Sequence, residues 1–258
     1  MEKIAEGTSS EIYELTNSTV VKLFKDNYQD IILEKEFNNN LLICKTGIHT
    51  AQVISKINLE GREGIVFEKL NGITMAMLLK KKPWLIIYYA KRFAETHVAI
   101  HQCLCPGLPS QKNALKQFIY LKNLSKDAED RLLDILNKLP DGENICHNDF
   151  NLDNVVLFHN RYYTIDWFCA TNGDPAMDIA HTLINLKRLI KGSRYSLARL
   201  IKQIYFYIFA IIYLRHSMGL SGVPRQSINM WERFLLSIDI HRWEEPLDSN
   251  RILSMRDE

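Results

Sequence analysis

Cysteine is scarce in this sequence, and its spacing supports neither a disulfide framework nor a zinc site. The chain has five cysteines among 258 residues, an odd number, and no pair of C-x-x-C motifs. Cys103 and Cys105 lie two residues apart, which is not the usual spacing of zinc ligands. Because disulfides are rare in reducing compartments, this cysteine usage favours a cytoplasmic protein.

Long apolar runs are also missing. The most apolar stretch, residues 204–214, is eleven residues long, whereas a helix needs about 20 apolar residues to span a bilayer. Residues 1–10 contain no apolar segment of the kind found in signal peptides. We therefore expect no membrane association, and we interpret residues 204–214 as part of a buried helix.

Charge is balanced rather than concentrated. The net charge is +2, and the densest cationic run is only Lys80, Lys81 and Lys82. This distribution gives no reason to expect nucleic-acid binding. The G-x-x-x-x-G-K-[ST] motif is absent as well, so a Walker-type NTPase is not supported. With 47% hydrophobic residues, the chain is long enough for one large domain or for two lobes around a shared cleft.

The first quarter of the chain has the pattern of an antiparallel sheet. Alternating residues and turn signals predict strands over residues 3–5, 11–15, 19–24, 50–58 and 64–68. Between the third and fourth strands, Asp26 or Asn27 is a candidate N-cap for a helix that runs to about Cys44. Three strands, a helix and two strands are the order of a kinase small lobe.

After Gly72 the pattern becomes helical. Helical spacing of apolar residues predicts helices over 73–81, 84–103 and 126–139, with Ser125 as the N-cap of the last. A hairpin is expected over 155–165, and helices again after Asp174. The sequence thus predicts an α+β protein with an N-terminal lobe, residues 1–71, and a C-terminal lobe, residues 72–258.

The densest polar cluster lies just before this hairpin. Residues 146–154 read C-H-N-D-F-N-L-D-N, and Ile165 and Asp166 end the hairpin. Phosphoryl transfer needs an acid that accepts the proton of the substrate hydroxyl, and Asp149 fits this role. Mg²⁺ needs oxygen ligands, and the hairpin can bring Asn154 and Asp166 together to provide them. The alternative is a polar loop that only caps a helix.

Upstream residues complete a candidate nucleotide site. Gly7, Thr8, Ser9 and Ser10 join the first two strands, where backbone N–H groups can cradle phosphates. Lys22 shares a strand face with Val20 and Phe24, so its ammonium needs a partner. Glu36, or else Glu34, on the following helix can supply it. Between the lobes, the backbone from Glu68 to Leu70 is expected to face a nucleotide base.

Two other features have more than one interpretation. His97 and His101 are four residues apart on a predicted helix, but a general base of the H-E-x-x-H type is missing, so core histidines are favoured over a zinc site. Asp178 either anchors the catalytic loop by accepting backbone hydrogen bonds or is an acid favoured by a helix N-terminus.

These motifs resemble the aminoglycoside phosphotransferase and choline kinase superfamily, and the similarity extends over residues 4–186. The segment from His147 to Asn154 resembles that family's catalytic loop, in which His147 and Asp178 give structural support. The sequence I-D-W at 165–167 resembles its metal-binding segment, and G-D-P-A-M-D at 173–178 the start of the next helix. The resemblance implies a bilobal protein-kinase-like fold, Mg²⁺, and ATP or GTP as phosphoryl donor.

Asn148 is a departure from part of this superfamily. Aminoglycoside kinases usually carry glycine at this position, whereas choline and ethanolamine kinases carry asparagine. The acceptor therefore stays open between an aminoglycoside-like antibiotic, a choline-, ethanolamine- or thiamine-type metabolite, and a sugar. Acids such as Asp153, Asp174, Glu232 or Asp239 would favour a cationic acceptor if they line its pocket.

The sequence as a whole predicts a cytoplasmic small-molecule kinase, acting as a monomer or homodimer on a nucleotide and a small acceptor. A non-catalytic nucleotide-binding protein of kinase fold is a second hypothesis, although the full set Lys22, Asp149, Asn154 and Asp166 argues against it. A protein kinase is disfavoured because only seven residues separate Asp166 from Asp174, too few for an activation segment.

Overall fold

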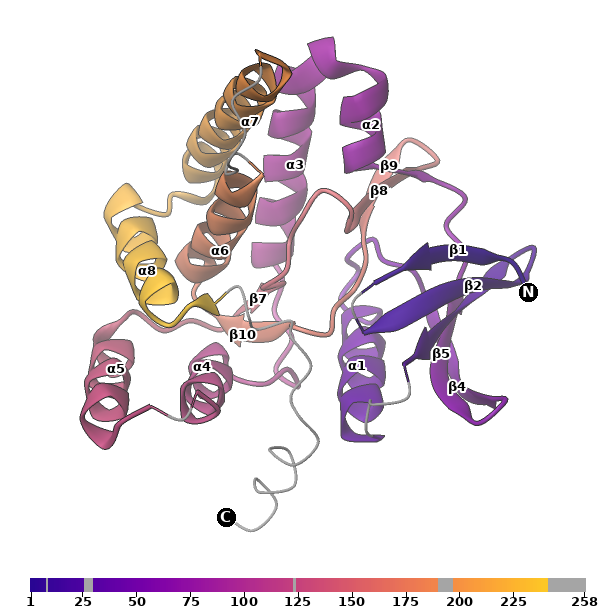
Figure 1. The fold of residues 1–258 in the computed structure, drawn as a ribbon, viewed down its shortest axis with the longest axis horizontal. Coiled ribbons are helices and arrows are strands. Elements are labelled where there is room, and N and C mark those ends of the chain that lie inside the picture. Colours follow the sequence, from indigo (N-terminus) through magenta and orange to yellow (C-terminus); the bar gives the residue numbers. More distant parts are fainter. Residues whose placement is uncertain (8, 26–29, 123, 190–196, 241–258) are drawn as a thin grey trace.

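An antiparallel sheet forms the N-terminal lobe of the computed structural model, which describes residues 1–7, 9–25, 30–122, 124–189 and 197–240 (Figure 1). Its strands are β1 (Lys3–Glu6), β2 (Ser10–Thr16), β3 (Thr19–Phe24), β4 (Val53–Leu59) and β5 (Arg62–Glu68). They are ordered β1-β2-β3-β5-β4. All five predicted strands are therefore present, although β4 begins three residues later than expected.

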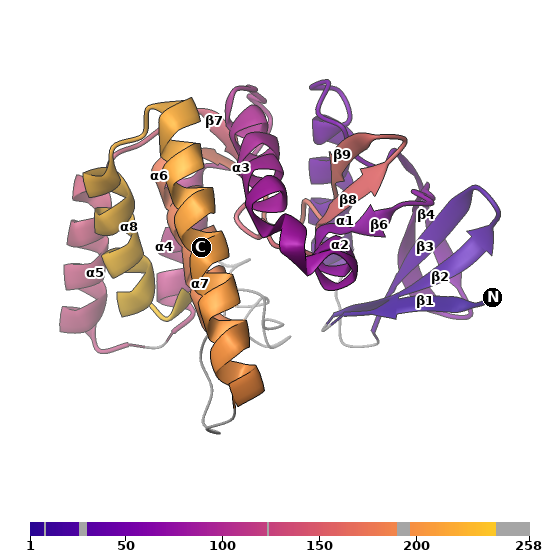
Figure 2. The ribbon, with the colours of Figure 1, turned by 90° about the horizontal axis from the view of Figure 1, so that it is seen from above.

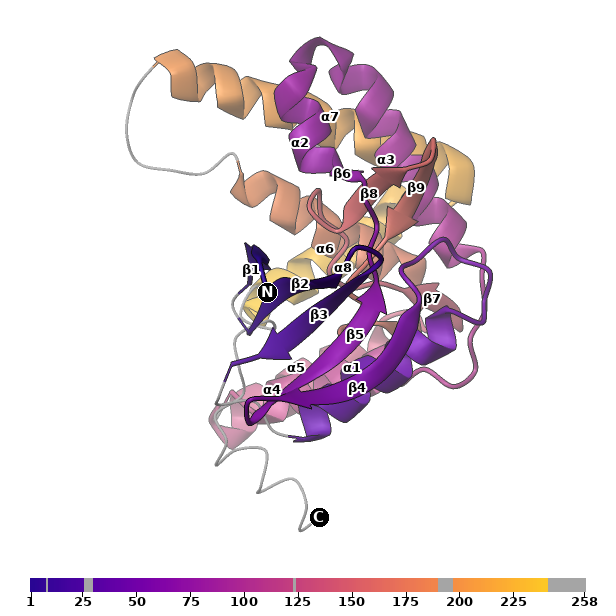
Figure 3. The ribbon, with the colours of Figure 1, turned by 90° about the vertical axis from the view of Figure 1, so that its right-hand side faces the viewer.

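Alternation along β3 gives the sheet its two apolar faces. Val21 and Leu23 are buried with Val66 on one face. Phe24 and Ile65 point to the other face, where α1 (Asp30–Ile43) covers β4 and β5 (Figure 3). The helix ends one residue before the predicted limit, and its candidate caps, Asp26 and Asn27, lie outside the described residues. Lys22 consequently points towards the helix-covered face.

Helices dominate the C-terminal lobe, as predicted. They are α2 (Met75–Lys81), the 3₁₀ helix η1 (Pro83–Leu85), α3 (Ile86–His101), α4 (Gln111–Tyr120), α5 (Lys126–Lys138), α6 (Pro175–Arg188), α7 (Leu197–Ser221) and α8 (Arg225–Ser237). The core lies where α3, α6, α7 and α8 meet, around Phe93, Phe209 and Trp231. None of the helices in the described part of the chain combines the length and the apolar character needed to cross a membrane.

Short strands connect the two parts. The strands β6 (Ile73–Thr74), β8 (Val155–Phe158) and β9 (Arg161–Thr164) form a three-stranded sheet in the order β6-β8-β9. Figure 2 shows β8 and β9 between the large sheet and the helices. The predicted hairpin is confirmed. The predicted helix over 73–81 is too long at its start, because Ile73 and Thr74 pair with β8 and Thr74 then caps α2 through its hydroxyl.

Local signals explain most of the helix limits in the C-terminal lobe. Asp174 caps α6 by accepting a hydrogen bond from Ala176 N at 2.9 Å, and Pro175 occupies the first turn. Ser125 holds the N-cap position of α5 as predicted, although its side chain makes no capping hydrogen bond. The predicted helix over 84–103 divides into η1 and α3, because Pro83 starts a separate 3₁₀ turn.

Three elements lie where the sequence analysis predicted neither a helix nor a strand: α4, β7 (Asn144–Cys146) and β10 (Thr171–Gly173). The two strands pair with each other, with Cys146 opposite Thr171, and each forms one further single bridge, Asn144 to Leu104 and Asn172 to Ser110. Strands of three residues joined across such a distance leave no local pattern in the sequence. They frame the candidate catalytic loop, residues 147–154, which begins directly after β7.

We predict that Gly72→Ala destabilises the protein, because this glycine lies tightly against β8 between the lobes. A Cβ at this position would lie 2.6 Å from the carbonyl oxygen of Leu157, which is backbone and cannot rotate away. We expect the free energy of unfolding to fall by about 1–3 kcal/mol in urea titrations. Gly219→Ala is the control: a Cβ there meets nothing within 4 Å, so the variant should gain about 0.5–1 kcal/mol. Equal stability of the two variants would contradict this packing.

Candidate active site

The loop after β7 holds the Asp149 carboxylate between two asparagine amides. Asn154 Nδ2 donates to Asp149 Oδ2 at 2.9 Å and to the Asp149 backbone carbonyl at 3.0 Å. Asn151 Nδ2 donates to Asp149 Oδ1 at 3.0 Å. A carboxylate oxygen has two lone pairs, so these two amide donors do not exhaust Asp149 as an acceptor for a substrate hydroxyl. Both bonds from Asn154 use its nitrogen, which leaves its Oδ1 as a potential metal ligand.

Asn151 was not identified from the sequence, yet it organises the whole loop. Its Oδ1 accepts hydrogen bonds from the backbone N–H groups of Asp153 and Asn154, at 2.9 and 3.1 Å. This Asx-type turn reverses the chain within four residues and brings Asn154 back over Asp149. The signal available in the sequence was an asparagine at the centre of a polar loop, a residue type that favours such turns.

Asn148 has a structural role that glycine cannot fill. Its backbone is left-handed, with φ at 60°, a conformation that asparagine tolerates better than most residues. The buried side chain donates to Thr171 Oγ1 at 2.7 Å and to Cys169 O at 2.8 Å, and it accepts from Gln111 Nε2 at 3.2 Å. Asparagine at this position thus connects the catalytic loop to β10 and to the start of α4.

Lys22, Glu36 and Asp166 meet at the junction of the lobes. Lys22 Nζ lies 2.6 Å from Glu36 Oε1 and 3.1 Å from Asp166 Oδ1. Glu34, the second candidate partner for Lys22, instead pairs with Lys56 at the surface. The ammonium comes from β3, the first carboxylate from α1 and the second from the segment after β9. One buried lysine therefore joins two consecutive elements of the N-terminal lobe to a segment that lies 144 positions further along the chain.

The pKa values in this cluster follow from one ammonium shared by two carboxylates. Burial raises the pKa of Glu36 to about 7, because desolvation outweighs the attraction of Lys22. Burial acts against the charged form of Lys22, but the charges of Asp166 and Glu36 prevail and raise its pKa. Burial likewise opposes ionisation of Asp166, yet Lys22 lowers its pKa. Lys22 and Asp166 are hence both charged at neutral pH.

Asp166 and Asn154 form an oxygen-rich corner suited to a hard cation. Ile165 N donates to the backbone carbonyl of Asn154 at 3.0 Å, so the hairpin does bring its two ends together. The Asp166 side chain is 39% exposed, whereas that of Lys22 is only 10% exposed. A carboxylate and an amide oxygen at an accessible position are ligands that Mg²⁺ accepts. These residues fit such an ion.

Trp167, next to Asp166, fixes this segment to its surroundings. The indole is fully buried, and its Nε1 donates to Thr50 Oγ1 at 3.0 Å and to Thr164 O at 3.1 Å. Asn39 on α1 donates to the Trp167 carbonyl at 3.1 Å. The indole ring lies 4.6 Å from the ring of His147, which in turn bonds through Nε2 to Ile165 O at 3.0 Å. The orientation of Asp166 is thereby set from both lobes.

The other predicted nucleotide-binding residues lie at the ends of the sheet. Ser9 lies in the β1–β2 connection and Ser10 is the first residue of β2, where its carbonyl accepts from Gly7 N at 2.8 Å. Thr8 lies outside the described residues. The Glu68 carboxylate accepts from Gln52 N at 3.3 Å, and Leu70 O accepts from Gly72 N at 2.7 Å. Within the described ranges, no hydrogen bond or ion pair joins these residues to the Lys22 cluster.

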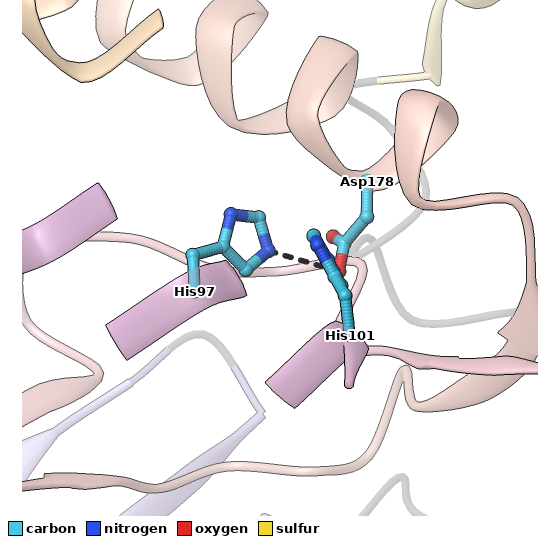
Figure 4. A group of neighbouring side chains, drawn as sticks. All are labelled: His97, His101 and Asp178. Atoms are coloured by element: carbon cyan, nitrogen blue, oxygen red, sulfur yellow. Dashed lines mark hydrogen bonds and ion pairs between the residues drawn. The ribbon is translucent and has the colours of Figure 1, made fainter. Parts of the chain in front are cut away.

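Asp178 is fully buried beneath the catalytic loop and serves as a common acceptor. Its Oδ2 accepts from His147 N at 2.7 Å, and its Oδ1 from Asn148 N at 2.8 Å. His97 and His101 on α3 bond to the same Oδ2 through Nε2, at 2.9 and 3.1 Å (Figure 4). The carboxylate thus receives hydrogen bonds from the loop and from α3 at once.

The three side chains in Figure 4 do not suit a metal ion, although two histidines and a carboxylate are common ligands. Zinc ligands lie about 2.0–2.2 Å from the ion. Here each histidine nitrogen lies at hydrogen-bond distance from Asp178 itself, and the loop's N–H groups occupy the carboxylate's other sites. The cluster is therefore a hydrogen-bond network, consistent with core histidines.

The network extends to α7. Tyr213 OH and His97 Nδ1 lie 2.7 Å apart. Since His97 Nε2 donates to Asp178, its Nδ1 must accept, and the tyrosine hydroxyl is the donor. Tyr213, His97 and Asp178 consequently form one chain of hydrogen bonds that ends at the backbone of the catalytic loop. Tyr213 was predicted only as a core aromatic.

We predict that His97 contributes to acid sensitivity. Burial lowers its pKa to about 4 in the folded protein, against the attraction of Asp178. The unfolded chain binds a proton near the ordinary histidine pKa of about 6.5, so stability falls as the pH decreases from about 6.5 to 4, by roughly 3 kcal/mol from this group. His97→Gln keeps a donor for Asp178 but cannot titrate, and should show a smaller loss of stability over this range.

Urea titrations at a series of pH values measure this effect. His216→Gln is the control, because His216 also lies on the α3–α7 contact but is partly exposed. The control should keep the pH dependence of the wild type. The same pH dependence in His97→Gln would show that His97 is not the responsible group.

Comparison with solved structures places this site in a known fold. The aminoglycoside-3'-phosphotransferase of type VIII aligns with 92% of this chain and 91% of its own, at a TM-score of 0.60 and 17% identity. A thermostable mutant of aminoglycoside phosphotransferase APH(4)-Ia, in a ternary complex with ADP and hygromycin B, gives a TM-score of 0.61 at 14% identity, covering 97% of this chain and 87% of that one. APH(3'')-Id from Streptomyces rimosus gives 0.57 at 16% identity, covering 92% and 91%. These likenesses establish the bilobal α+β kinase-like fold.

A search of curated proteins found no match. The model of the phosphotransferase enzyme family, in contrast, matches residues 1–200, which include the sheet, the catalytic loop, Asp166 and Asp178. The chain therefore belongs to the phosphotransferase enzyme family.

Proposed function

We propose that this protein is a kinase that transfers the γ-phosphoryl group of ATP or GTP to a hydroxyl group of a small molecule. The observation that carries the proposal is the convergence of Lys22, Asp166, Asn154 and Asp149 at the junction of the lobes. Nucleotide complexes of structural neighbours, such as the one that contains ADP and hygromycin B, support a nucleotide donor. The acceptor side is the C-terminal lobe, next to Asp149.

Asp149 is the proposed general base. Its carboxylate is oriented by Asn151 and Asn154 and takes the proton of the acceptor hydroxyl as the oxygen attacks the γ-phosphorus. A bond forms between this oxygen and phosphorus, and the bond from phosphorus to the β–γ bridging oxygen breaks. The products are a phosphate ester and a nucleoside diphosphate, which leaves with the bridging oxygen.

Lys22 is proposed to position the donor phosphates. Its raised pKa keeps the ammonium charged, and Glu36 fixes the side chain from below. Asn154 Oδ1 and Asp166 would hold Mg²⁺, which when bound neutralises phosphate charge. The β1–β2 connection that includes Ser9, with the adjoining Ser10, would cover the phosphates, and the segment from Glu68 to Leu70 would lie along the base. The positions of these residues on the sheet and on the loop support the proposed placements.

We predict that Mg²⁺ and nucleotide stabilise the protein together. At a hundredfold excess over Kd, a ligand that binds only the folded state adds about 2.7 kcal/mol. Thermal unfolding with ATP or GTP, each with and without Mg²⁺, should show a Mg²⁺-dependent rise in Tm for one nucleotide or both. Asp166→Ala should abolish the Mg²⁺-dependent part, because the ion loses a carboxylate ligand.

Asp153→Ala is the matched control for this experiment. It removes a carboxylate from the same loop region, but the side chain is exposed and its residue contacts the loop through the backbone. The control should keep the rise in Tm. Nucleotide stabilisation that is unaffected by Asp166→Ala would remove Asp166 from the metal site, and no stabilisation by either nucleotide would favour a non-catalytic protein.

We predict that Asp149→Asn separates binding from turnover. The amide keeps the shape of the side chain but cannot take a proton, so the rate of NDP release should fall by about 10²–10⁴-fold. A coupled assay without added acceptor, in which water replaces the hydroxyl compound, measures this rate. Nucleotide stabilisation should persist in the variant. A variant with full turnover would rule out Asp149 as the base.

A further inference from the structure

Asp149 lies between two anchored stretches of the catalytic loop. On one side, the backbone N–H groups of His147 and Asn148 donate to the buried carboxylate of Asp178. On the other side, the ring of Phe150 is packed into the core, and the residue is only 1% exposed. The position of Asp149 therefore depends on how firmly each of its two neighbouring stretches is held.

One side chain, His97 on α3, contacts both anchors. Its Nε2 donates to Asp178 Oδ2 at 2.9 Å. Its imidazole stacks on the ring of Phe150, with centroids 4.0 Å apart and an angle of 5° between the planes. Since Phe150 directly follows Asp149, a rotation of the imidazole would disturb the loop on both sides of the proposed base at once.

Hydrogen bonds at both ring nitrogens fix the orientation of His97, whereas His101 is bonded at one nitrogen. Tyr213 OH lies 2.7 Å from His97 Nδ1. His101 reaches the same oxygen of Asp178 through Nε2 at 3.1 Å (Figure 4), but its buried Nδ1 has no hydrogen-bond partner among the described residues. The torsion that turns an imidazole has a broad, roughly two-fold profile. A flip of the His97 ring would put carbon atoms at both nitrogen positions, so Tyr213 and Asp178 together oppose it.

The charge on Asp178 determines the direction of these bonds. An ionised carboxylate only accepts, so the single proton of a neutral His97 ring lies on Nε2, and Nδ1 is an acceptor. Burial lowers the pKa of His97 to about 4, which keeps the ring neutral at pH 7. The hydroxyl of Tyr213 thus supplies the donor that this nitrogen requires.

Packing alone does not account for a tyrosine at this position of α7. The Tyr213 ring is fully buried and lies 5.4 Å from the ring of Phe93. One turn earlier on the same helix, Phe209 packs on Phe93 at 5.6 Å without a hydroxyl group. A buried hydroxyl costs free energy of desolvation unless it is hydrogen-bonded. The bond to His97 is therefore the contribution that phenylalanine could not make.

We propose that Tyr213 is a positioning residue for phosphoryl transfer, because its hydroxyl fixes the His97 ring and, through that ring, the anchors on both sides of Asp149. This inference rests on the proposed kinase function and deepens it. Tyr213 acts through His97 and does not itself contact the reacting groups. Misplacement of a catalytic group by about 1 Å can lower a rate by about 10²-fold, so the loss of one distant hydroxyl has a measurable effect.

Tyr213→Phe tests this role, since it removes the hydroxyl and keeps the ring. In the coupled assay of NDP release without added acceptor, we expect kcat to fall by about 10–100-fold. The KM for the nucleotide should stay unchanged, because Lys22 and Asp166 belong to a separate cluster. Tyr205→Phe is the matched control: Tyr205 also lies on α7, and its buried hydroxyl has no hydrogen-bond partner within the described ranges. The control should keep both constants of the wild type.

A double substitution shows whether Tyr213 acts through His97. The side chain introduced by His97→Gln can donate to Asp178 but has no atom at the position of Nδ1, so Tyr213 loses its partner. We expect His97→Gln to lower kcat, and Tyr213→Phe in the same chain to cause no further loss. Losses that multiply in the double variant would show that Tyr213 acts independently of His97. Thermal unfolding with nucleotide and Mg²⁺ establishes that each variant is folded and binds the donor.

Hydrogen exchange tests the anchoring without any turnover. The backbone N–H groups of His147 and Asn148 should exchange about tenfold faster in Tyr213→Phe than in the wild type or in Tyr205→Phe. Unchanged exchange would overturn the proposal, as would a wild-type kcat in Tyr213→Phe, an effect confined to KM, or an equal loss of kcat in Tyr205→Phe. A wild-type protein without NTP turnover would instead contradict the proposed function, whatever the exchange rates are.

Discussion

A single buried carboxylate supports the geometry of the catalytic loop. Asp178 accepts hydrogen bonds from the backbone of His147 and Asn148 and from the side chains of His97 and His101. Complete burial opposes its ionisation, but attraction to His97 and the hydrogen bonds from both histidines lower its pKa well below the usual range. Because the loop backbone bonds to a fixed charge on α6, Asp149 and Asn154 project from a rigid base rather than from a free loop.

The proposed phosphoryl transfer also requires a fixed position of one lobe relative to the other, and a second set of charges connects the two lobes. Lys22 belongs to the sheet, Glu36 to α1 and Asp166 to the segment after β9, so their contacts span the junction. Burial of Lys22 makes the ion pairs costly to break, since a lone ammonium would remain in a dry site. The Asp178 network fixes the conformation of the loop, and the Lys22 cluster fixes the position of the sheet relative to that loop.

The parts of this architecture that depend on residues close together in the sequence were predictable from it. Alternation around Lys22 gave β3, and Asp174 followed by Pro175 marked the start of α6. The loop motif singled out Asp149 because acid and amide residues occur there at a fixed spacing. The contact between Tyr213 and His97 was not predictable, because the two lie 116 positions apart in the sequence and each matches an ordinary core pattern. Pairing of β7 with β10 escaped prediction for the same reason.

The position of Trp167 makes its indole a natural reporter of the candidate active site. This indole is buried between His147, Thr50 and the backbone of Thr164, and it directly follows Asp166. Any shift of the segment that holds Asp166 changes the polar surroundings of the ring. Trp167 is one of four tryptophans, so the part of the intrinsic fluorescence that comes from this indole can follow the junction of the lobes, without a label and whatever the chemical identity of the acceptor.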